Sequence, residues 1–236
     1  MGGEKKEYRQ LPGLPFSVLG SAVSAFAAIT EITSIIITVP DDPRIGEAAA
    51  RNALPPELLA GELPAVHFVP GGATRRASVF NALSLLSSGG SPPGMVLIHD
   101  GARPWVSPNL IKRVIAAVHI HRAVVPLMPL VETPKETVLP LAEMPLASLP
   151  TAELPLDGSG AVLIQQHLKR SVVGTAQTPQ GFAFPEIFTA HEQAACRAGS
   201  VEYTDDAEIW AAFCGPVAAI IGEPQNRKIT FEDDIC

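Results

Sequence analysis

Two kinds of hydrophobic pattern alternate along the chain. Short apolar runs rich in Ile and Val predict buried strands, and longer segments with apolar residues every three or four positions predict amphipathic helices. The predicted strands cover residues 35–39, 66–69, 95–99, 123–127 and 217–221. The predicted helices cover residues 16–28, 76–86, 109–119, 185–198 and 205–213. This alternation predicts an α/β fold in which a mostly parallel sheet lies between two helical layers.

Residues 134–160 break this pattern. They are rich in Pro and Leu, and Pro140, Pro145, Pro150 and Pro155 are spaced five residues apart. A buried strand or helix could not hold these prolines, because each lacks an N–H donor. We therefore predict a protruding arm over residues 134–170, whose leucines would pack against a second subunit. The alternative is a disordered insertion.

The composition narrows the class of protein. A length of 236 residues allows one large domain or two small ones, and a hydrophobic content of 47% excludes a disordered chain. No apolar run reaches the roughly 18 residues that span a bilayer, and the N-terminus shows no signal-peptide pattern, so we expect a cytoplasmic protein without a membrane partner. A net charge of −7 argues against nucleic-acid binding but permits a phosphorylated small molecule as ligand. The three cysteines have neither disulfide nor metal-ligand spacing.

Asp100 and Arg103 directly follow the predicted strand at residues 95–99. Ligands of open α/β sheets bind at the carboxyl ends of strands, so an acid and a fixed cation here predict the mouth of a site. Gly101 and Ala102 between them would let a ligand approach the backbone. Asp100 could hold a hydroxyl or a metal-bound water, and Arg103 could grip phosphate oxygens. A local ion pair at a strand end is the alternative.

A glycine-rich turn precedes the predicted helix at residues 76–86. Gly71 and Gly72 follow a predicted strand, and such a turn can present backbone N–H groups to an anion or to the edge of a base. Arg75 and Ser78 are three residues apart, so they share one side of the helix start. A plain strand-to-helix turn with a solvated Arg75 would explain the same residues.

Four further polar segments carry weaker signals: residues 132–135, 175–182, 203–206 and 226–230. The first segment places a carboxylate, a hydroxyl and a cation at a strand exit. The alternative is that this segment is an ordinary polar turn. The second is a dense polar loop with two glutamines, shaped either for a site or for packing. In the third, helix capping alone explains Thr204 as N-cap and the two acids that follow. In the fourth, Lys228 could reach a phosphate or be an ordinary surface lysine.

Taken together and in this order, the motifs resemble the cytidylyltransferases that couple CTP to 2-C-methyl-D-erythritol 4-phosphate. The resemblance covers nearly the whole chain outside the arm. The matching segments are residues 71–79, 99–104, 129–135, 176–182, 204–207 and 226–230. Of these, residues 100–104 and 177–182 are the most specific.

The resemblance implies a three-layer, Rossmann-like nucleotidyltransferase domain that forms a homodimer through its arm. It implies transfer of CMP from CTP to 2-C-methyl-D-erythritol 4-phosphate, with release of pyrophosphate, in non-mevalonate isoprenoid precursor synthesis. Mg²⁺ would bind mainly through the nucleotide phosphates rather than at a metal site of the protein. Positioning and charge stabilisation carry reactions of this kind.

The resemblance also assigns roles to individual residues. Lys6 and Lys228 would flank the α-phosphate and stabilise the charge of the transition state. The sugar phosphate would be held by Asp100, Arg103, Thr133, Arg170, Thr204 and Lys228. The nucleotide would contact Gly72, Ala73, Ser78, Asp100 and Gly101.

The chain departs from the family pattern at its start. The family begins with a strand and a glycine-rich loop that ends in Arg-Met and wraps the triphosphate, whereas this chain begins with Met1 at the end of that loop. We therefore expect an N-terminally incomplete single domain over residues 1–236. Ala73 stands in place of an acid near the cytosine, and Glu132 stands in place of an aspartate. Two alternatives stay open: a cytidylyltransferase for another polyol phosphate, such as ribitol 5-phosphate, and a non-catalytic α/β interaction module.

Overall fold

A computed structural model of the chain describes residues 5–42, 44–61, 64–138, 162–197, 203–231 and 234. The chain divides into two compact units. The first combines Met1–Leu127 with Ala176–Cys236, and the second is Met128–Thr175. The two units are described one after the other.

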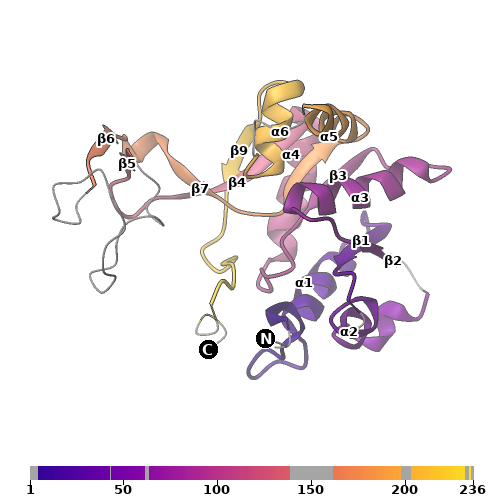
Figure 1. Cartoon of the computed structure of the whole chain (residues 1–236). Helices are drawn as coiled ribbons and strands as arrows, with labels where there is room; N and C mark the ends of the chain where they lie inside the picture. Colours follow the sequence, from indigo (N-terminus) through magenta and orange to yellow (C-terminus); the bar gives the residue numbers. More distant parts are fainter. Residues whose placement is uncertain are drawn as a thin grey trace. The chain divides into compact units, whose positions relative to one another are not determined.

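The first unit is built on a mixed sheet (Figure 1). Strands β3 (Met95–Ile98), β8 (Gln180–Ala183) and β4 (Ala123–Pro129) are neighbours in that order, and β9 (Ala218–Ile221) pairs with β4. β9 runs parallel to β4, whereas β8 runs antiparallel to both β3 and β4. The predicted α/β class is confirmed. The sheet is not wholly parallel, because the polar loop predicted at residues 175–182 contains the start of β8.

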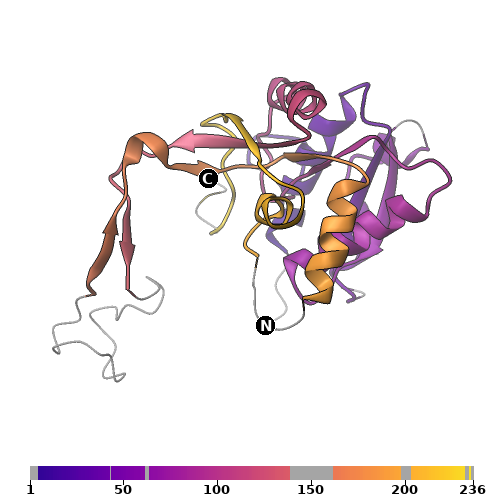
Figure 2. The same ribbon diagram turned by 90° about the horizontal axis from the view of Figure 1, so that it is seen from above.

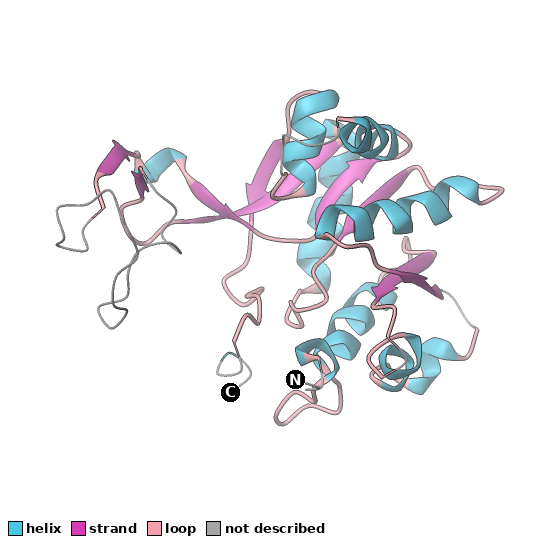
Figure 3. Cartoon of the chain, in the orientation of Figure 1, coloured by secondary structure: helices cyan, strands magenta, loops and turns pink. Residues whose placement is uncertain are grey.

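Two further strands, β1 (Ser34–Val39) and β2 (Ala65–Pro70), form a separate parallel pair (Figure 3). Helices α2 (Glu47–Asn52) and η2 (Pro56–Leu59) lie between them in the chain. One buried cluster joins β1 to α2 and to α1 (Val18–Ala27): Leu19, Val23, Ile37, Val39, Ala50 and Leu54. This apolar contact holds the strand pair within the first unit, because burial of such side chains is the main favourable term in folding.

Helices cover both faces of the central sheet. One face carries α4 (Pro108–His121), and the other carries α3 (Arg75–Ser88), α5 (Glu186–Cys196) and α6 (Asp206–Phe213). Figure 2, turned by 90°, shows α4 and the α5–α6 pair on opposite sides of the sheet. Side chains alternate along β3, so that Leu97 packs in the α4 layer and Val96 in the layer of α3, α5 and α6. The predicted three-layer arrangement is present.

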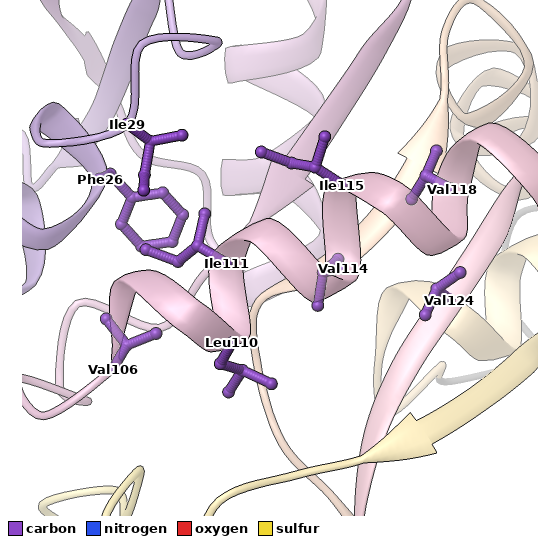
Figure 4. Close-up of a cluster of buried hydrophobic side chains, with 9 residues drawn as sticks. All are labelled: Phe26, Ile29, Val106, Leu110, Ile111, Val114, Ile115, Val118 and Val124. Atoms are coloured by element: carbon purple, nitrogen blue, oxygen red, sulfur yellow. The ribbon is translucent and has the colours of Figure 1, made fainter.

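Helix α4 shows how the sequence starts a helix and buries one face of it. Ser107 is the N-cap, and its hydroxyl accepts a hydrogen bond from the Leu110 N–H at 3.0 Å. Pro108 takes the first helical position, where a missing N–H costs nothing. The buried stripe comprises Leu110, Ile111, Val114, Ile115 and Val118, and Figure 4 shows it with Phe26 beside Ile111. Burying each such side chain contributes about 1.5–3 kcal/mol.

Every strand and helix predicted from the hydrophobic pattern has a counterpart in the structure, with ends that agree within two residues. The elements that the pattern did not predict, such as α2 and β8, are short. A run of four to six residues carries too few positions for a period to be recognised. Among the described residues, no helix has the length and apolar character that a bilayer crossing requires.

The second unit contains an antiparallel pair, β5 (Lys135–Thr137) and β6 (Ile164–His167), followed by η4 (Arg170–Val172) and by most of β7 (Gly174–Ala176), whose last residue belongs to the first unit. Its exposed apolar side chains include Val131, Leu163 and Val172. Residues 139–161, with the four regularly spaced prolines, lie outside the described residues. The role of residues 134–170 as a dimerisation arm stays a prediction.

Candidate functional site

Three cations surround Asp100 at the exit of β3. Its carboxylate lies 3.1 Å from Lys228 Nζ, 3.6 Å from Arg103 Nε and 3.8 Å from Arg75 Nε. The Asp100 side chain is 17% exposed, and this burial alone would raise its pKa. Lys228, followed by Arg75 and Arg103, outweighs the burial and holds the pKa of Asp100 below its ordinary value. The ionised carboxylate therefore gathers three cationic side chains at one point.

These cations come from separate parts of the chain. Arg103 follows Asp100 in a tight turn closed by its own N–H, which donates to the Asp100 carbonyl at 3.0 Å. Arg75 is the first residue of α3, and Lys228 lies in the segment after β9. That segment is tied to the same turn, because the Ile229 N–H donates to the Ala102 carbonyl at 2.8 Å. The structure thus brings together Asp100, Arg103 and Lys228, and it adds Arg75, which the sequence indicated only as part of the glycine-rich turn.

His99 fixes the shape of this strand exit. Its Nε2 lies 3.2 Å from the Arg103 carbonyl, and its Nδ1 lies 3.0 Å from Thr178 Oγ1, which accepts a bond from the Asp100 N–H at 3.1 Å. Because a carbonyl can only accept, Nε2 carries the proton, and Nδ1 accepts from the Thr178 hydroxyl. Burial lowers the pKa of His99 to about 4, so the ring is neutral at pH 7. The neutral ring therefore contacts the Arg103 carbonyl at the end of the turn directly, and it contacts the Asp100 N–H at the start of the turn through the Thr178 hydroxyl.

Lys6, in η1 (Lys6–Tyr8), reaches the same C-terminal segment. Its Nζ donates to the Ile229 carbonyl at 2.8 Å, one residue beyond Lys228. Leu11, Val18 and Ile229 form a buried cluster that packs the N-terminal segment against this part of the chain. The two lysines predicted to be catalytic are therefore attached to the same stretch of backbone, although 222 positions separate them in the sequence.

The glycine-rich turn closes on itself through Ser78. The Ser78 hydroxyl accepts from the Gly72 N–H at 3.0 Å and donates to the Thr74 carbonyl at 3.0 Å. A Cβ on Gly72 would lie 2.3 Å from Ala77 Cβ, so a larger residue could not approach the start of α3 so closely. Ala73 at the tip of the turn is exposed. The turn is ordered by its own residues, and the nucleotide-binding role of Gly72, Ala73 and Ser78 stays a prediction.

A buried carboxylate lies behind Arg75. Asp206 is fully buried, and its carboxylate lies 2.8 Å from Arg75 Nη2 and 3.1 Å from His191 Nε2. Burial would lower the pKa of Arg75, but Asp206, together with Asp100 and Asp205, outweighs burial and raises it. Arg75 is thus held between Asp206 and Asp100. The sequence did not indicate Asp206 or His191 as partners of the site, because their contact depends on how α5 and α6 pack.

Helix α6 starts one residue later than capping by Thr204 predicted. The N-cap is Asp205, whose carboxylate accepts from the Glu208 N–H at 2.9 Å. Thr204 instead donates its N–H and its hydroxyl to the Glu208 carboxylate, at 2.7 and 3.0 Å. Gln180 supports this start, because its amide donates to Asp205 at 2.8 Å and accepts from the Ala207 N–H at 3.1 Å. The prediction of Thr204 as N-cap was wrong, and its role in holding substrate stays a prediction.

The remaining residues that were predicted to bind substrate lie in different parts of the structure. Gly101 lies in the turn after β3, where an added Cβ would approach Leu19 Cδ1 to 3.3 Å. Thr133 and Arg170 belong to the second unit, and Arg170 Nη1 donates to the Val131 carbonyl there. The assignment of Thr133 and Arg170 as ligands of the sugar phosphate stays a prediction.

Within the part of the chain that the structure describes, no group of three or more His, Cys, Asp and Glu side chains could hold a metal ion. Asp100 lies at the centre of the site, but its carboxylate is already paired with three cations. The described residues therefore do not fit a magnesium ion held by the protein alone.

The three-layer α/β unit with its mixed central sheet matches the nucleotidyltransferase fold. Residues 1–140 and 155–236 match the family IspD, 2-C-methyl-D-erythritol 4-phosphate cytidylyltransferase. The chain belongs to this family. The resemblance that its motifs showed is confirmed.

Relatives and solved structures agree with this assignment. The bifunctional enzyme IspD/IspF of Bradyrhizobium sp. (strain ORS 278) is 36% identical over 235 residues, which cover 98% of this chain and 50% of that protein. The chain thus spans about half the length of the curated relatives that it matches. The 2-C-methyl-D-erythritol 4-phosphate cytidylyltransferase of Thermus thermophilus is 27% identical with a TM-score of 0.65, over 98% of this chain and 90% of that one. The 4-diphosphocytidyl-2C-methyl-D-erythritol synthase of Anaerococcus prevotii shares the fold, with 24% identity and a TM-score of 0.71, over 96% of this chain and 85% of that one.

Proposed function

We propose that the chain transfers the cytidylyl group of CTP to 2-C-methyl-D-erythritol 4-phosphate, giving 4-diphosphocytidyl-2-C-methyl-D-erythritol and pyrophosphate. The observation that carries this proposal is the cluster of Lys228, Arg103 and Arg75 around Asp100 at the exit of β3. Such a cluster suits phosphate groups, because Arg and Lys donate charge-assisted hydrogen bonds to their oxygens. Membership of the cytidylyltransferase family supplies the identity of the two substrates.

In the proposed reaction, a phosphate oxygen of the methylerythritol phosphate attacks the α-phosphorus of CTP. A new P–O bond forms there, the bond from the α-phosphorus to the bridging oxygen of the β-phosphate breaks, and pyrophosphate leaves. Lys228 and Lys6 would stabilise the negative charge that grows on the α-phosphate oxygens. Arg103 would hold the attacking phosphate, and Asp100 would accept hydrogen bonds from hydroxyl groups of the sugar.

Magnesium enters this proposal as part of the CTP–Mg²⁺ substrate. The phosphates of CTP would supply most of the ligands, because Mg²⁺ prefers oxygen ligands and commonly binds through substrate phosphates. No step of the proposal requires the protein to hold the metal on its own.

We further propose that the second unit mediates a homodimer. Its exposed Val131, Leu163 and Val172 support this, because side chains with more than 70% of their surface exposed gain from burial against a second copy. Thr133 and Arg170 of this unit are proposed ligands of the sugar phosphate. The cytoplasmic location expected from the sequence stays a prediction, as does the absence of nucleic-acid and membrane partners.

The test is release of pyrophosphate from CTP–Mg²⁺ by the purified chain, with 2-C-methyl-D-erythritol 4-phosphate and ribitol 5-phosphate compared as acceptors. The proposal predicts release with the first acceptor and a kcat/KM for the second that is at least about 100-fold lower. A preference for ribitol 5-phosphate would replace the proposed substrate. Binding of neither CTP nor an acceptor would favour a non-catalytic interaction module.

A further inference from the structure

The side-chain amide of Gln177 uses its full hydrogen-bonding capacity on the segment before Lys228. Its Nε2 donates to the Glu223 carbonyl at 2.9 Å and to the Asn226 carbonyl at 3.2 Å. Its Oε1 accepts from the Glu223 N–H at 3.0 Å and from Asn226 Nδ2 at 3.4 Å. A primary amide offers two donors and two acceptor sites, so all four are occupied. Gln177 is only 6% exposed, which makes each of these bonds costly to lose.

The same segment is linked to Arg103. The Asn226 carbonyl accepts from Arg103 Nη1 at 2.8 Å as well as from Gln177, and Asn226 Nδ2 donates to the Thr178 carbonyl at 2.7 Å. One backbone carbonyl therefore joins Gln177 to the cation that pairs with Asp100. Asn226 itself is fully buried.

Lys228 depends on this segment for its position. Its side chain is 45% exposed, so packing fixes it little, and a lysine side chain has many rotamers. The backbone that carries it is anchored on either side, by the Gly222 N–H on the Leu127 carbonyl at 2.8 Å and by the Ile229 N–H on the Ala102 carbonyl at 2.8 Å. Gln177 holds the stretch between these two anchors.

From this geometry we propose that Gln177 is a positioning residue for the cytidylyl transfer proposed above: it sets Lys228 and Arg103 at the separation that the reaction requires. Gln177 touches neither substrate and acts through the 223–226 backbone. The inference rests on the proposed function. It assigns a mechanical role to a glutamine whose own chemistry is poorly suited to catalysis.

The first test is Gln177→Glu, which keeps the shape of the side chain but places a carboxylate oxygen against the Glu223 and Asn226 carbonyls. We expect kcat for CTP and 2-C-methyl-D-erythritol 4-phosphate to fall at least about tenfold, and KM for CTP to change less than about threefold. Gln193→Glu, at an exposed position of α5, is the matched control and should keep wild-type kinetics. Circular dichroism and thermal unfolding establish that both variants are folded.

A double-mutant cycle separates positioning from general damage. In a Lys228→Ala background, Gln177→Glu should lower the residual rate by a clearly smaller factor than in the wild type, because one of the two cations that it positions is already gone. An equal loss in both backgrounds would overturn the inference, as would a folded Gln177→Glu variant with wild-type kcat. If Gln177→Glu does not fold, the neutral Gln177→Met variant takes its place in the same cycle.

The outcomes separate failure of the proposed function from failure of this inference. A wild-type chain that transfers no cytidylyl group would overturn both. An active wild type with an equally active Gln177 variant would overturn the inference alone.

Discussion

At the scale of single residues, His99 illustrates how a histidine beside a polar site can be structural. Its two ring nitrogens are engaged by the Arg103 carbonyl and the Thr178 hydroxyl. Burial lowers the pKa of His99 to about 4, although neighbouring Asp100 acts in the opposite direction. A second ring proton would reverse the direction of the hydrogen bond with the Thr178 hydroxyl and place a positive charge in a buried setting.

This pKa predicts a pH dependence of stability. Between pH 6.5 and 4, the unfolded chain binds a proton at His99 that the folded chain does not bind, so the free energy of unfolding falls as pH falls through this range. The loss from this residue should be up to about 3 kcal/mol, and none of it should appear above the unfolded pKa. Denaturant unfolding at several pH values should show a shallower slope in His99→Asn, which cannot titrate but keeps the other ionisable groups. Equal slopes for the two proteins would contradict the assignment.

Asp100 is the residue on which the charge balance of the site depends. Asp100→Asn keeps the shape but leaves Lys228, Arg103 and Arg75 without their shared counter-charge. We expect KM for 2-C-methyl-D-erythritol 4-phosphate to rise and kcat/KM to fall at least about tenfold. Steady-state kinetics measures both constants. Asp42→Asn, which removes the charge from the exposed pair with Arg44, is the control, and kinetics for Asp100→Asn that match this control would argue against the role of Asp100.

The predictability of the site differs from residue to residue. Asp100 and Arg103 could be predicted because charges directly after a buried run must leave the core. Lys228 was a weak candidate from its position after a predicted strand, and only the order of motifs shared with a family gave it a specific role. Asp206, His191 and Gln177 could not be predicted as partners, because their contacts join segments far apart in the sequence through tertiary packing.

At the scale of elements, β8 marks where the hydrophobic pattern fails. Its sequence, Gln180 to Ala183, has no β-branched residue and follows a polar loop, yet all four residues are buried. The strand is specified by its neighbours instead, since it fills the position between β3 and β4. Long periodic elements such as α4 could be predicted from sequence because one face alone has to be apolar.

Gly181 in β8 is expected to be sensitive to added volume. A Cβ there would lie 2.5 Å from Val118 Cγ2 and 2.6 Å from Val114 Cγ1 of α4. Because valine side chains are stiff, Gly181→Ala should lower the free energy of unfolding by about 1–3 kcal/mol. Gly94→Ala, where nothing lies within 4 Å of the new Cβ, should leave it unchanged. Chemical denaturation of both variants measures the difference, and equal stabilities would show that α4 can move away from β8.

At the scale of the whole molecule, the site draws on both ends of the chain. The N-terminal segment reaches it through Lys6 on the Ile229 carbonyl, and the C-terminal segment through Lys228 on Asp100. The central turn of residues 100–103 joins them, since Ala102 accepts from the Ile229 N–H. An alternation of strands and helices predicts the three-layer fold, but it does not predict which distant segments meet at one strand exit. Membership of a family of known motif order supplies that information.

The most direct test is the turnover number of Lys228→Ala with CTP–Mg²⁺ and 2-C-methyl-D-erythritol 4-phosphate. Release of pyrophosphate measures this turnover. Lys228 is 45% exposed, and Arg103 and Arg75 still pair with Asp100 after its removal, so the variant should stay folded and lose only about 1 kcal/mol in the free energy of unfolding. Removing the cation proposed to stabilise the α-phosphate should lower kcat at least about 100-fold, while Lys112→Ala on the exposed surface of α4 should behave as wild type. A folded Lys228→Ala variant that releases pyrophosphate at the wild-type rate would contradict the claim that the cluster around Asp100 is the catalytic centre.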